Sequence, residues 1–321
     1  MRSPTLRAGG TTLDVSRPLV VGIVNATPDS FSDAGDRSPE RWVERALRCH
    51  EAGAHIVEVG GESNVSNRLP VEAAVEIERV VPVVEALVAA GAVVSVDTHR
   101  PETAEAVLDA GAAIVNDIDG MRDPRMVEVC ARGEAGVVLM HTETAPKVSR
   151  WDEGLYPGGV VERVVEWTAE RLAALEAAGI ERERVVLDPG PDFAKTPRQT
   201  VEALRGLDRL AEELGRPVMV AVSRKDFVGA LTGRRPRQRG AGTLAAIAAA
   251  LRRGGRLLRV HDVEATVDFL AVWAALEEGE EVPAELRVGE DVRREEPAAG
   301  DARSGTEAAP EGDEARAPGP A

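Results

Sequence analysis

The stretch VVSVDTHRPETAEAVLDAGAAIVNDIDG, residues 93–120, contains the repeating unit from which the fold can be predicted. It begins with a short β-branched run, continues with apolar residues at helical spacing, and returns to a second β-branched run. Pro101 stands where the helix would begin, and Gly111 stands where a left-handed residue would end it. The stretch therefore predicts a strand, a helix and a second strand.

The same alternation recurs along the chain. Strands are predicted at residues 19–25, 56–61, 93–98, 114–118, 136–141, 184–190, 218–224 and 257–262. Helices are predicted at residues 39–52, 71–90, 101–110, 125–132, 160–178, 197–214, 242–253 and 263–277. Eight strand–helix pairs over about 260 residues predict an α/β fold, a (β/α)₈ TIM barrel. A doubly wound open sheet is the alternative, but VNATPDSF follows the first strand where that fold usually has a glycine-rich phosphate loop.

Composition excludes several classes of protein. The chain has 321 residues and a formal charge of −16, whereas a nucleic-acid-binding protein needs a basic face. No run of 18 apolar residues predicts a membrane span, and residues 1–10 lack the apolar core of a signal peptide. Cys49 and Cys130 are too few for a disulfide framework. We therefore expect a soluble cytoplasmic protein that binds neither nucleic acid nor membrane.

The charge distribution also suggests domain boundaries. Residues 1–16 are predicted to be an N-terminal lead-in, and residues 17–277 the barrel. Residues 277–321 hold 14 acidic and 5 basic side chains, without a periodic apolar face beyond Pro297. Such a segment buries too little apolar surface to offset the entropy of ordering. Residues 278–321 are therefore predicted to be a disordered acidic tail.

Two scarce residue types gather near predicted strand ends. Of the 39 basic residues only Lys147, Lys195 and Lys225 are lysine, and the chain has four asparagines. Because arginine serves elsewhere as the general cation, we expect these lysines to have particular roles.

Function in a barrel belongs to the carboxyl ends of the strands. One set of polar side chains there suits the edge of a flat heterocycle, because it offers acceptors to ring N–H groups and donors to a carbonyl: Asp97, Asn116, Asp188 and Lys225. A second set suits a phosphate-rich anion with Mg²⁺: Arg224, Arg259, His261, Asn25 and Asp33. Zinc-type ligand spacing and a G-x-S-x-G nucleophile motif are both missing from the sequence.

These motifs resemble those of the dihydropteroate synthases over about residues 17–277. The resemblance is carried by VGIVNATPDSFSDAG, GAHIVEVGGES, the stretch quoted first, VVLDPGPDFAKTP, VAVSRKDFVGAL and LLRVHDV. It implies a (β/α)₈ barrel and a transferase of folate biosynthesis. Such an enzyme joins p-aminobenzoate to 6-hydroxymethyl-7,8-dihydropterin diphosphate and releases pyrophosphate. It also implies Mg²⁺ as cofactor and a homodimer.

The resemblance further implies roles for individual residues. The pterin would be held by Asp97, Asn116, Asp188 and Lys225, of which Asp97, Asp188 and Lys225 would be catalytic. Mg²⁺ would be bound by Asn25, with Asp33 nearby. Arg259 and His261 would hold the diphosphate, whereas Phe193 and Ser223 would lie near p-aminobenzoate. Substrate would also contact Asn64 and a loop over the diphosphate, which contains Thr27, Asp29, Ser30, Phe31 and Asp33.

The sequence departs from the family pattern mainly on the side of the second substrate. The family usually has Thr-Arg-Pro-Gly where residues 64–67 read NVSN, and His-Met-Arg-Gly-Thr-Pro where residues 141–147 read HTETAPK. Asp192, Ala194 and Ala221 replace glycines, and Asp226 replaces a serine. A silent or altered-acceptor pterin-binding paralogue is therefore an alternative. A methyltetrahydrofolate-dependent methyltransferase is a further one, although the SFSD loop and the RVHD pair argue against it because a methyl donor carries no diphosphate.

Overall fold

The computed structural model describes residues 5–27, 38–62, 70–148 and 150–293. Its longer sheet consists of β3 (Leu19–Asn25), β4 (Ile56–Gly60), β5 (Val93–Asp97), β6 (Ile114–Asp117), β7 (Gly136–Met140), β8 (Val185–Asp188), β9 (Val218–Val220) and β10 (Gly255–Val260). Within the described residues these eight strands form a closed barrel, in which each strand pairs in parallel with the next and β10 pairs with β3. The predicted (β/α)₈ fold is thus confirmed, and the open sheet is excluded.

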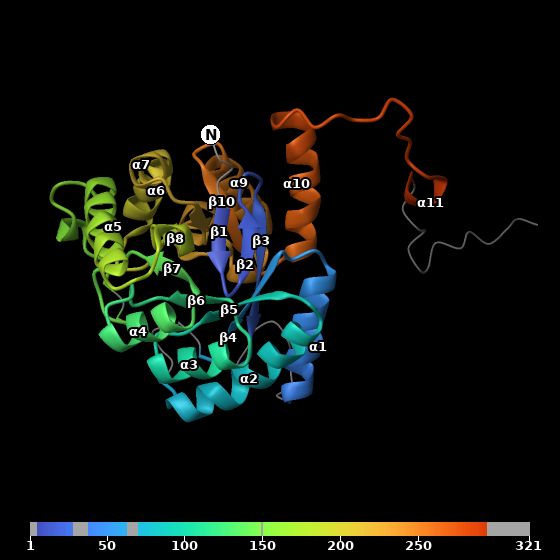
Figure 1. Ribbon diagram of the computed structural model, residues 1–321. Helices are drawn as coiled ribbons and strands as arrows, with labels where there is room; N and C mark the ends of the chain where they lie inside the picture. Colours follow the sequence, from blue (N-terminus) through green and yellow to red (C-terminus); the bar gives the residue numbers. More distant parts are fainter. Residues whose placement is uncertain (1–4, 28–37, 63–69, 149, 294–321) are drawn as a thin grey trace, which may run out of the picture. The chain divides into compact units, whose positions relative to one another are not determined.

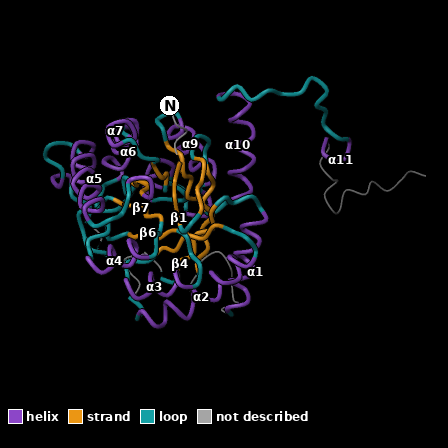
Figure 2. Tube along the Cα trace, in the orientation of Figure 1, coloured by secondary structure: helices purple, strands orange, loops and turns teal. Residues whose placement is uncertain are grey.

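Helices follow the strands and cover the outside of the barrel (Figures 1 and 2). They are α1 (Pro39–Glu51), α2 (Ala73–Ala89), α3 (Pro101–Asp109), α4 (Pro124–Arg132), α5 (Val160–Ala177), α6 (Pro197–Arg205), α7 (Leu207–Leu214), α8 (Asp226–Thr232), α9 (Gly240–Leu251) and α10 (Val263–Glu277). A further short helix, α11 (Glu290–Arg293), follows later in the chain. Short 3₁₀ turns occupy Glu153–Leu155, Arg182–Arg184 and Pro236–Gln238. Four of the helices begin with a proline, as the sequence predicts. Proline is tolerated there because the first N–H of a helix has no hydrogen-bond partner within the helix.

The structure departs from the sequence prediction at two helices. The segment predicted as one helix, 197–214, forms α6 and α7, which meet at Gly206. A Cβ atom at Gly206 would overlap the Val161 side chain of α5, so the close approach of these helices requires glycine. The short helix α8, directly after Lys225, was not predicted from the sequence.

The N-terminal segment closes one end of the barrel. Strands β1 (Thr5–Ala8) and β2 (Thr11–Asp14) form an antiparallel hairpin. Leu6 and Ala8 of the hairpin join a buried cluster with residues near the amino ends of the barrel strands. That cluster also contains Leu19, Val21, Ile56, Ile114, Val138, Val186, Met219 and Leu257. This cluster is the apolar plug of the barrel, and the polar side chains lie at the opposite, carboxyl-terminal end.

The chain divides into two compact units, Met1–Ala274 and Ala275–Ala321. The first contains the barrel. The part of the predicted acidic tail from residue 294 onward lies outside the described residues. Among the described helices, none is long and apolar enough to cross a membrane.

The plug gives a testable stability prediction. Leu6 is 0% exposed, so Leu6→Ala is expected to lower the free energy of unfolding by roughly 2–5 kcal/mol, because it leaves a cavity at the barrel end. Leu231 is 70% exposed, and Leu231→Ala is expected to change stability by less than about 0.5 kcal/mol. Urea unfolding of both variants measures the difference. Equal stabilities would contradict the packing role of the hairpin.

Candidate active site

The barrel brings the predicted polar side chains to the carboxyl ends of neighbouring strands. Asn25 ends β3, Asp97 ends β5 and Asp188 ends β8, and Asn116 lies beside Asp97 in the β5–β6 register. Arg259 lies in β10 and donates to the Asp97 carboxylate, with 2.9 Å between Nη2 and Oδ2. Two residues that the sequence assigned to different substrate groups, pterin and diphosphate, are therefore in direct contact.

A buried carboxylate that the sequence reasoning missed joins the same network. Glu58 in β4 accepts from Arg259 Nε at 2.5 Å, from Asn116 Nδ2 at 3.1 Å and from Ser95 Oγ at 3.2 Å. The signal in the sequence is a glutamate inside the apolar strand IVEVG. Its two strand neighbours of the same parity are Ile56 and Gly60, so Glu58 faces the barrel interior like them.

The charges within this network determine the ionisation of Arg259. Burial acts to lower the pKa of Arg259, but the Glu58 and Asp97 carboxylates outweigh burial, and the pKa lies above its ordinary value. An unpaired charge in the barrel interior would be strongly disfavoured. The guanidinium therefore stabilises each of the two carboxylates and is stabilised by them. The Oδ1 atom of Asn116 is buried without a hydrogen-bond partner, which leaves one acceptor for a ligand.

Asp188 lies at the end of β8, beside a turn. Its Oδ1 accepts the Gly190 backbone N–H at 2.7 Å. Burial raises the pKa of Asp188, whereas the Gly190 hydrogen bond and the charges of Lys225 and Arg259 oppose that effect. Asp188 is therefore a buried carboxylate close to cations.

Lys225 is held by the loop that follows Asp188. Its Nζ donates to the Pro191 carbonyl at 3.1 Å and lies 4.4 Å from the centroid of the Phe193 ring. Burial lowers the pKa of Lys225, and the Asp192 carboxylate opposes this shift. Phe193 thus contacts Lys225, a residue of the predicted pterin set.

Ser223 and His261 also bond directly to each other. The Ser223 hydroxyl lies 3.0 Å from His261 Nδ1 and accepts the His261 backbone N–H at 3.2 Å. The His261 residue is accessible to solvent. Desolvation by the surrounding protein, followed by the charges of Arg259 and Arg224, lowers the pKa of His261 to about 3. The lowered pKa favours the uncharged ring, which offers a hydrogen bond rather than a positive charge.

The substitutions of family glycines have local structural explanations. Asp192 and Ala194 adopt positive φ angles of 64° and 49°, which a glycine adopts with less strain. The Asp192 carboxylate accepts the Asp226 backbone N–H at 2.6 Å, and the Asp226 carboxylate pairs with Arg239 at 2.9 Å. Both added acids therefore have partners at the start of α8. Ala221 is buried in the same apolar cluster as Leu6 of the N-terminal hairpin.

The HTETAPK segment also reaches toward the end of β4. Lys147 forms an ion pair with Glu62, the last described residue before the altered loop. Arg100 binds the other carboxylate oxygen of Glu62 at 2.5 Å. A cation is therefore paired with Glu62, although it comes from another part of the chain than in the family pattern. Arg68 lies outside the described residues.

Magnesium was predicted at Asn25 and Asp33. The amide oxygen of Asn25 is a hard ligand of the kind that Mg²⁺ accepts, and Mg²⁺ commonly combines one or two protein ligands with phosphates and water. Within the described residues no three His, Cys, Asp or Glu side chains are placed to hold a metal. Asp33 lies outside them, as do Asp29, Ser30, Phe31 and Asn64, whereas Thr27 is described and buried.

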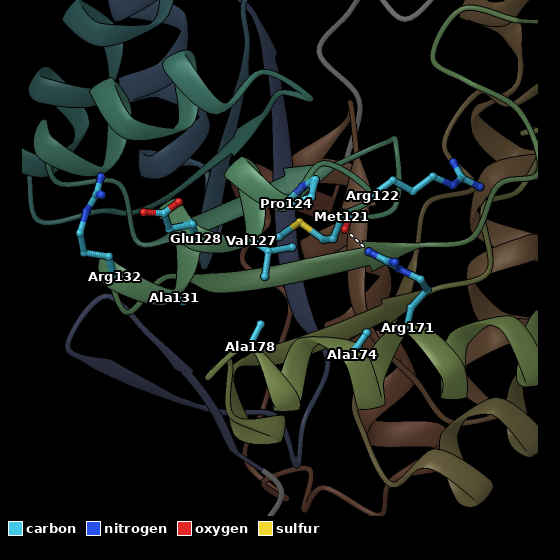
Figure 3. A pocket seen from close by; sticks show the side chains of 10 residues that line it. All are labelled: Met121, Arg122, Pro124, Val127, Glu128, Ala131, Arg132, Arg171, Ala174 and Ala178. Carbon is cyan, nitrogen blue, oxygen red and sulfur yellow. Dashed lines mark hydrogen bonds between the residues drawn. The ribbon is translucent and has the colours of Figure 1, made fainter.

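The pocket of Figure 3 is lined by other residues than this set. It is a cavity of about 520 Å³, lined by the segment after β6, by α4 and by α5. Its lining includes Arg122, Arg132 and Arg171, and none of the residues predicted to bind substrate. The candidate site is therefore the set of strand-end residues rather than this cavity.

The Glu58–Arg259 pair generates a prediction. Glu58→Gln leaves Arg259 paired with Asp97 alone, and is expected to lower the free energy of unfolding by roughly 1.5–3 kcal/mol, because a charge-assisted hydrogen bond is lost. Ser95→Ala removes only a neutral donor to the same carboxylate and should cost about 1 kcal/mol. Denaturant unfolding at pH 7 compares the two. A Glu58→Gln variant as stable as the original protein would contradict the network.

Comparison with known proteins identifies the family. A family model described as "Pterin binding enzyme" matches residues 21–261. The chain is 38% identical over 275 residues to a dihydropteroate synthase of Neisseria meningitidis, covering 84% of this chain and 96% of that protein. It is 39% identical over 271 residues to the Escherichia coli K12 enzyme of the same name, covering 83% and 94%.

Solved structures agree with this comparison. The Xanthomonas albilineans dihydropteroate synthase with 4-aminobenzoic acid has a TM-score of 0.79 and 43% identity, covering 88% of this chain and 100% of that one. The Thermus thermophilus enzyme in complex with 6HMPPP has a TM-score of 0.73 and 40% identity, covering 85% and 99%. The chain belongs to the pterin-binding enzymes and, among them, to the dihydropteroate synthases.

Proposed function

We propose that this chain condenses 6-hydroxymethyl-7,8-dihydropterin diphosphate with p-aminobenzoate to give 7,8-dihydropteroate and pyrophosphate in folate biosynthesis. The observation that carries the proposal is the Glu58–Arg259–Asp97 network. It joins a residue proposed for the diphosphate to one proposed for the pterin, at the end of the barrel where such enzymes bind substrate.

The pterin ring is proposed to lie among Asp97, Asn116, Asp188 and Lys225. Carboxylates accept hydrogen bonds from the ring amine and ring N–H, and the ammonium of Lys225 donates to the carbonyl. The buried Asn116 Oδ1 has no partner and suits a further ring donor. The aromatic ring of Phe193, already against Lys225 Nζ, would lie beside the reacting end.

The reaction is proposed to proceed by departure of the leaving group before attack. The bond from the pterin methylene carbon to the diphosphate oxygen breaks, and its electron pair leaves with pyrophosphate. The carboxylates of Asp97 and Asp188 stabilise the positive charge that develops on the pterin. The amine of p-aminobenzoate then donates its lone pair to form the new C–N bond and loses a proton. No protein nucleophile is required.

The leaving group is proposed to be held by Arg259 and His261. Arg259 contributes a permanent charge, and the neutral His261 contributes a hydrogen bond while its Nδ1 faces Ser223. Asn25 and Asp33 would hold Mg²⁺, which, when bound, offsets negative charge on the diphosphate.

An altered amine acceptor is the second candidate function. It is favoured by the added acids Asp192 and Asp226 and by the exchange of the family's cationic loop for NVSN. The Lys147–Glu62 pair favours retention of p-aminobenzoate instead, since it supplies a cation at Glu62, the residue before position 63. A methyltransferase is disfavoured, because the SFSD loop and the RVHD pair suit a diphosphate, which a methyl donor does not carry.

We also propose that the protein forms a homodimer, because Val272 of α10 is 59% exposed and offers apolar surface for a partner copy. We propose a reducing cytoplasm as its location, because both cysteines are free thiols. Light scattering of the purified protein would distinguish a dimer from a monomer.

The acceptor dependence of turnover tests the main proposal. Purified protein with Mg²⁺ and the pterin diphosphate is expected to release pyrophosphate only when p-aminobenzoate is added, because the amine completes the reaction. Adding EDTA should abolish release, and excess Mg²⁺ should restore it. Pterin binding without release of pyrophosphate with p-aminobenzoate would favour the altered-acceptor paralogue.

Removal of the Lys225 ammonium tests the pterin site. Lys225→Ala is expected to weaken pterin binding by roughly 1.5–3 kcal/mol, or about 10- to 150-fold, because a charged hydrogen bond is lost. Calorimetry measures the binding. Arg234→Ala, at an exposed residue of the α8–α9 connection, is the control and should bind normally. Normal binding by Lys225→Ala would contradict the proposed site.

A further inference from the structure

Lys195 is a buried lysine to which the proposed mechanism gives no role. It is 0% exposed and is among the largest fully buried side chains of the described residues. It is also one of three lysines in a chain with 36 arginines, counted from the 39 basic residues. A buried ammonium is retained only where several acceptors compensate for its desolvation.

The contacts of Lys195 converge on one nitrogen. Its Nζ lies 2.9 Å from His141 Nδ1 and 3.4 Å from the His141 carbonyl oxygen. It also donates to the carbonyls of Gly190 and Phe193, each at 3.1 Å. His141 follows β7, and its backbone N–H donates to the Asp188 carbonyl at 2.8 Å. Lys195 therefore connects the end of β7 to the loop that follows Asp188.

That loop has an unusual backbone. Gly190, Asp192 and Ala194 all have positive φ, at 64°, 64° and 49°. Three left-handed residues in such a short segment are unfavourable for the two that carry a Cβ atom, so side-chain contacts must hold the conformation. Lys195 Nζ binds two of the loop's carbonyls, and Lys225 Nζ binds a third, that of Pro191.

The shape of the contacts explains why lysine occupies this position. An ammonium carries three hydrogens on one atom and can bind acceptors that converge from several directions, whereas guanidinium is a planar fork. Burial lowers the pKa of Lys195 to about 7, with the charge of Asp188 opposing the shift. Burial, with the charge of Lys195, also lowers the pKa of His141 to about 3, so His141 Nδ1 is available as an acceptor.

We propose that Lys195 is a positioning residue for the pterin site. Its single nitrogen fixes the loop after Asp188, so that the Pro191 carbonyl and the Phe193 ring hold Lys225 in its binding position. It acts through Lys225 and Phe193 and does not touch the substrate. The inference rests on the proposed function and adds a residue to it.

The test measures pterin diphosphate binding by calorimetry together with thermal stability. Lys195→Met keeps the length of the side chain but removes the donors, and is expected to weaken pterin binding by up to about 100-fold through misplacement of Lys225. Lys195→Arg is expected not to restore binding, because its fork does not match the convergent acceptors. If Lys195→Met fails to fold, Lys195→Gln replaces it. Its shorter side chain has two N–H donors in a plane and cannot reach all the convergent acceptors, so a loss of pterin affinity is again expected.

Arg184 provides a matched control. It is 4% exposed and donates to the carbonyls of Ala135 and Cys130 at 2.9 and 2.5 Å, before the amino end of β8. Arg184→Met removes a buried cation that, like Lys195, donates to backbone carbonyls. Arg184 precedes β8, whereas Lys195 binds the loop after β8. Arg184→Met should therefore lower the melting temperature and leave pterin affinity within about twofold.

The outcomes separate the two proposals. Failure of the unaltered protein to bind pterin diphosphate would overturn the proposed function and the role of Lys195 with it. Normal binding by Lys195→Met or by Lys195→Arg, with the unaltered protein binding well, would overturn the positioning role alone. So would a parallel loss of affinity in Lys195→Met and Arg184→Met, because that would show general destabilisation.

Discussion

The structure depends on the neutralisation of charge inside a closed barrel. Glu58, Asp97 and Arg259 come from three different strands, and each of the two carboxylates bonds to Arg259 within 3 Å. Desolvation penalises each of these groups, so none is stable in the interior without its partners. The apolar plug at the opposite end of the barrel carries no such requirement. The closed barrel therefore has a packed apolar end and a charged end, and the charged end is where ligand chemistry is available.

The loop after Asp188 extends the charged end of the barrel, and two lysines hold it in place. Lys195 binds carbonyls of the loop after Asp188 from one direction, and Lys225 binds the Pro191 carbonyl from another. The two lysines differ in exposure and in role. Lys195 is fully buried among backbone acceptors, whereas Lys225 lies next to the proposed substrate. This arrangement explains why lysine rather than arginine occupies positions 195 and 225.

The departures from the family sequence pattern are also accommodated by local contacts. Asp192 replaces a glycine in the left-handed region and binds the first N–H of α8, and the neighbouring Asp226 pairs with Arg239. From the sequence alone these acids favoured a silent or altered-acceptor paralogue. The structure gives each of them a partner, which lowers their effect on a ligand because hydrogen-bonded and paired carboxylates exert a weaker outward field.

The sequence by itself determined the strand–helix alternation, the family and most polar residues at the strand ends, because periodicity, proline positions and long motifs are local properties. Only the tertiary structure decided which of those residues touch. Glu58 looked like one acid in an apolar strand, and the division of 197–214 at Gly206 depended on the approach of α5. The partners of Arg259 are 162 and 201 residues distant along the chain. Contacts at such separations follow from barrel closure and register, which no local pattern encodes.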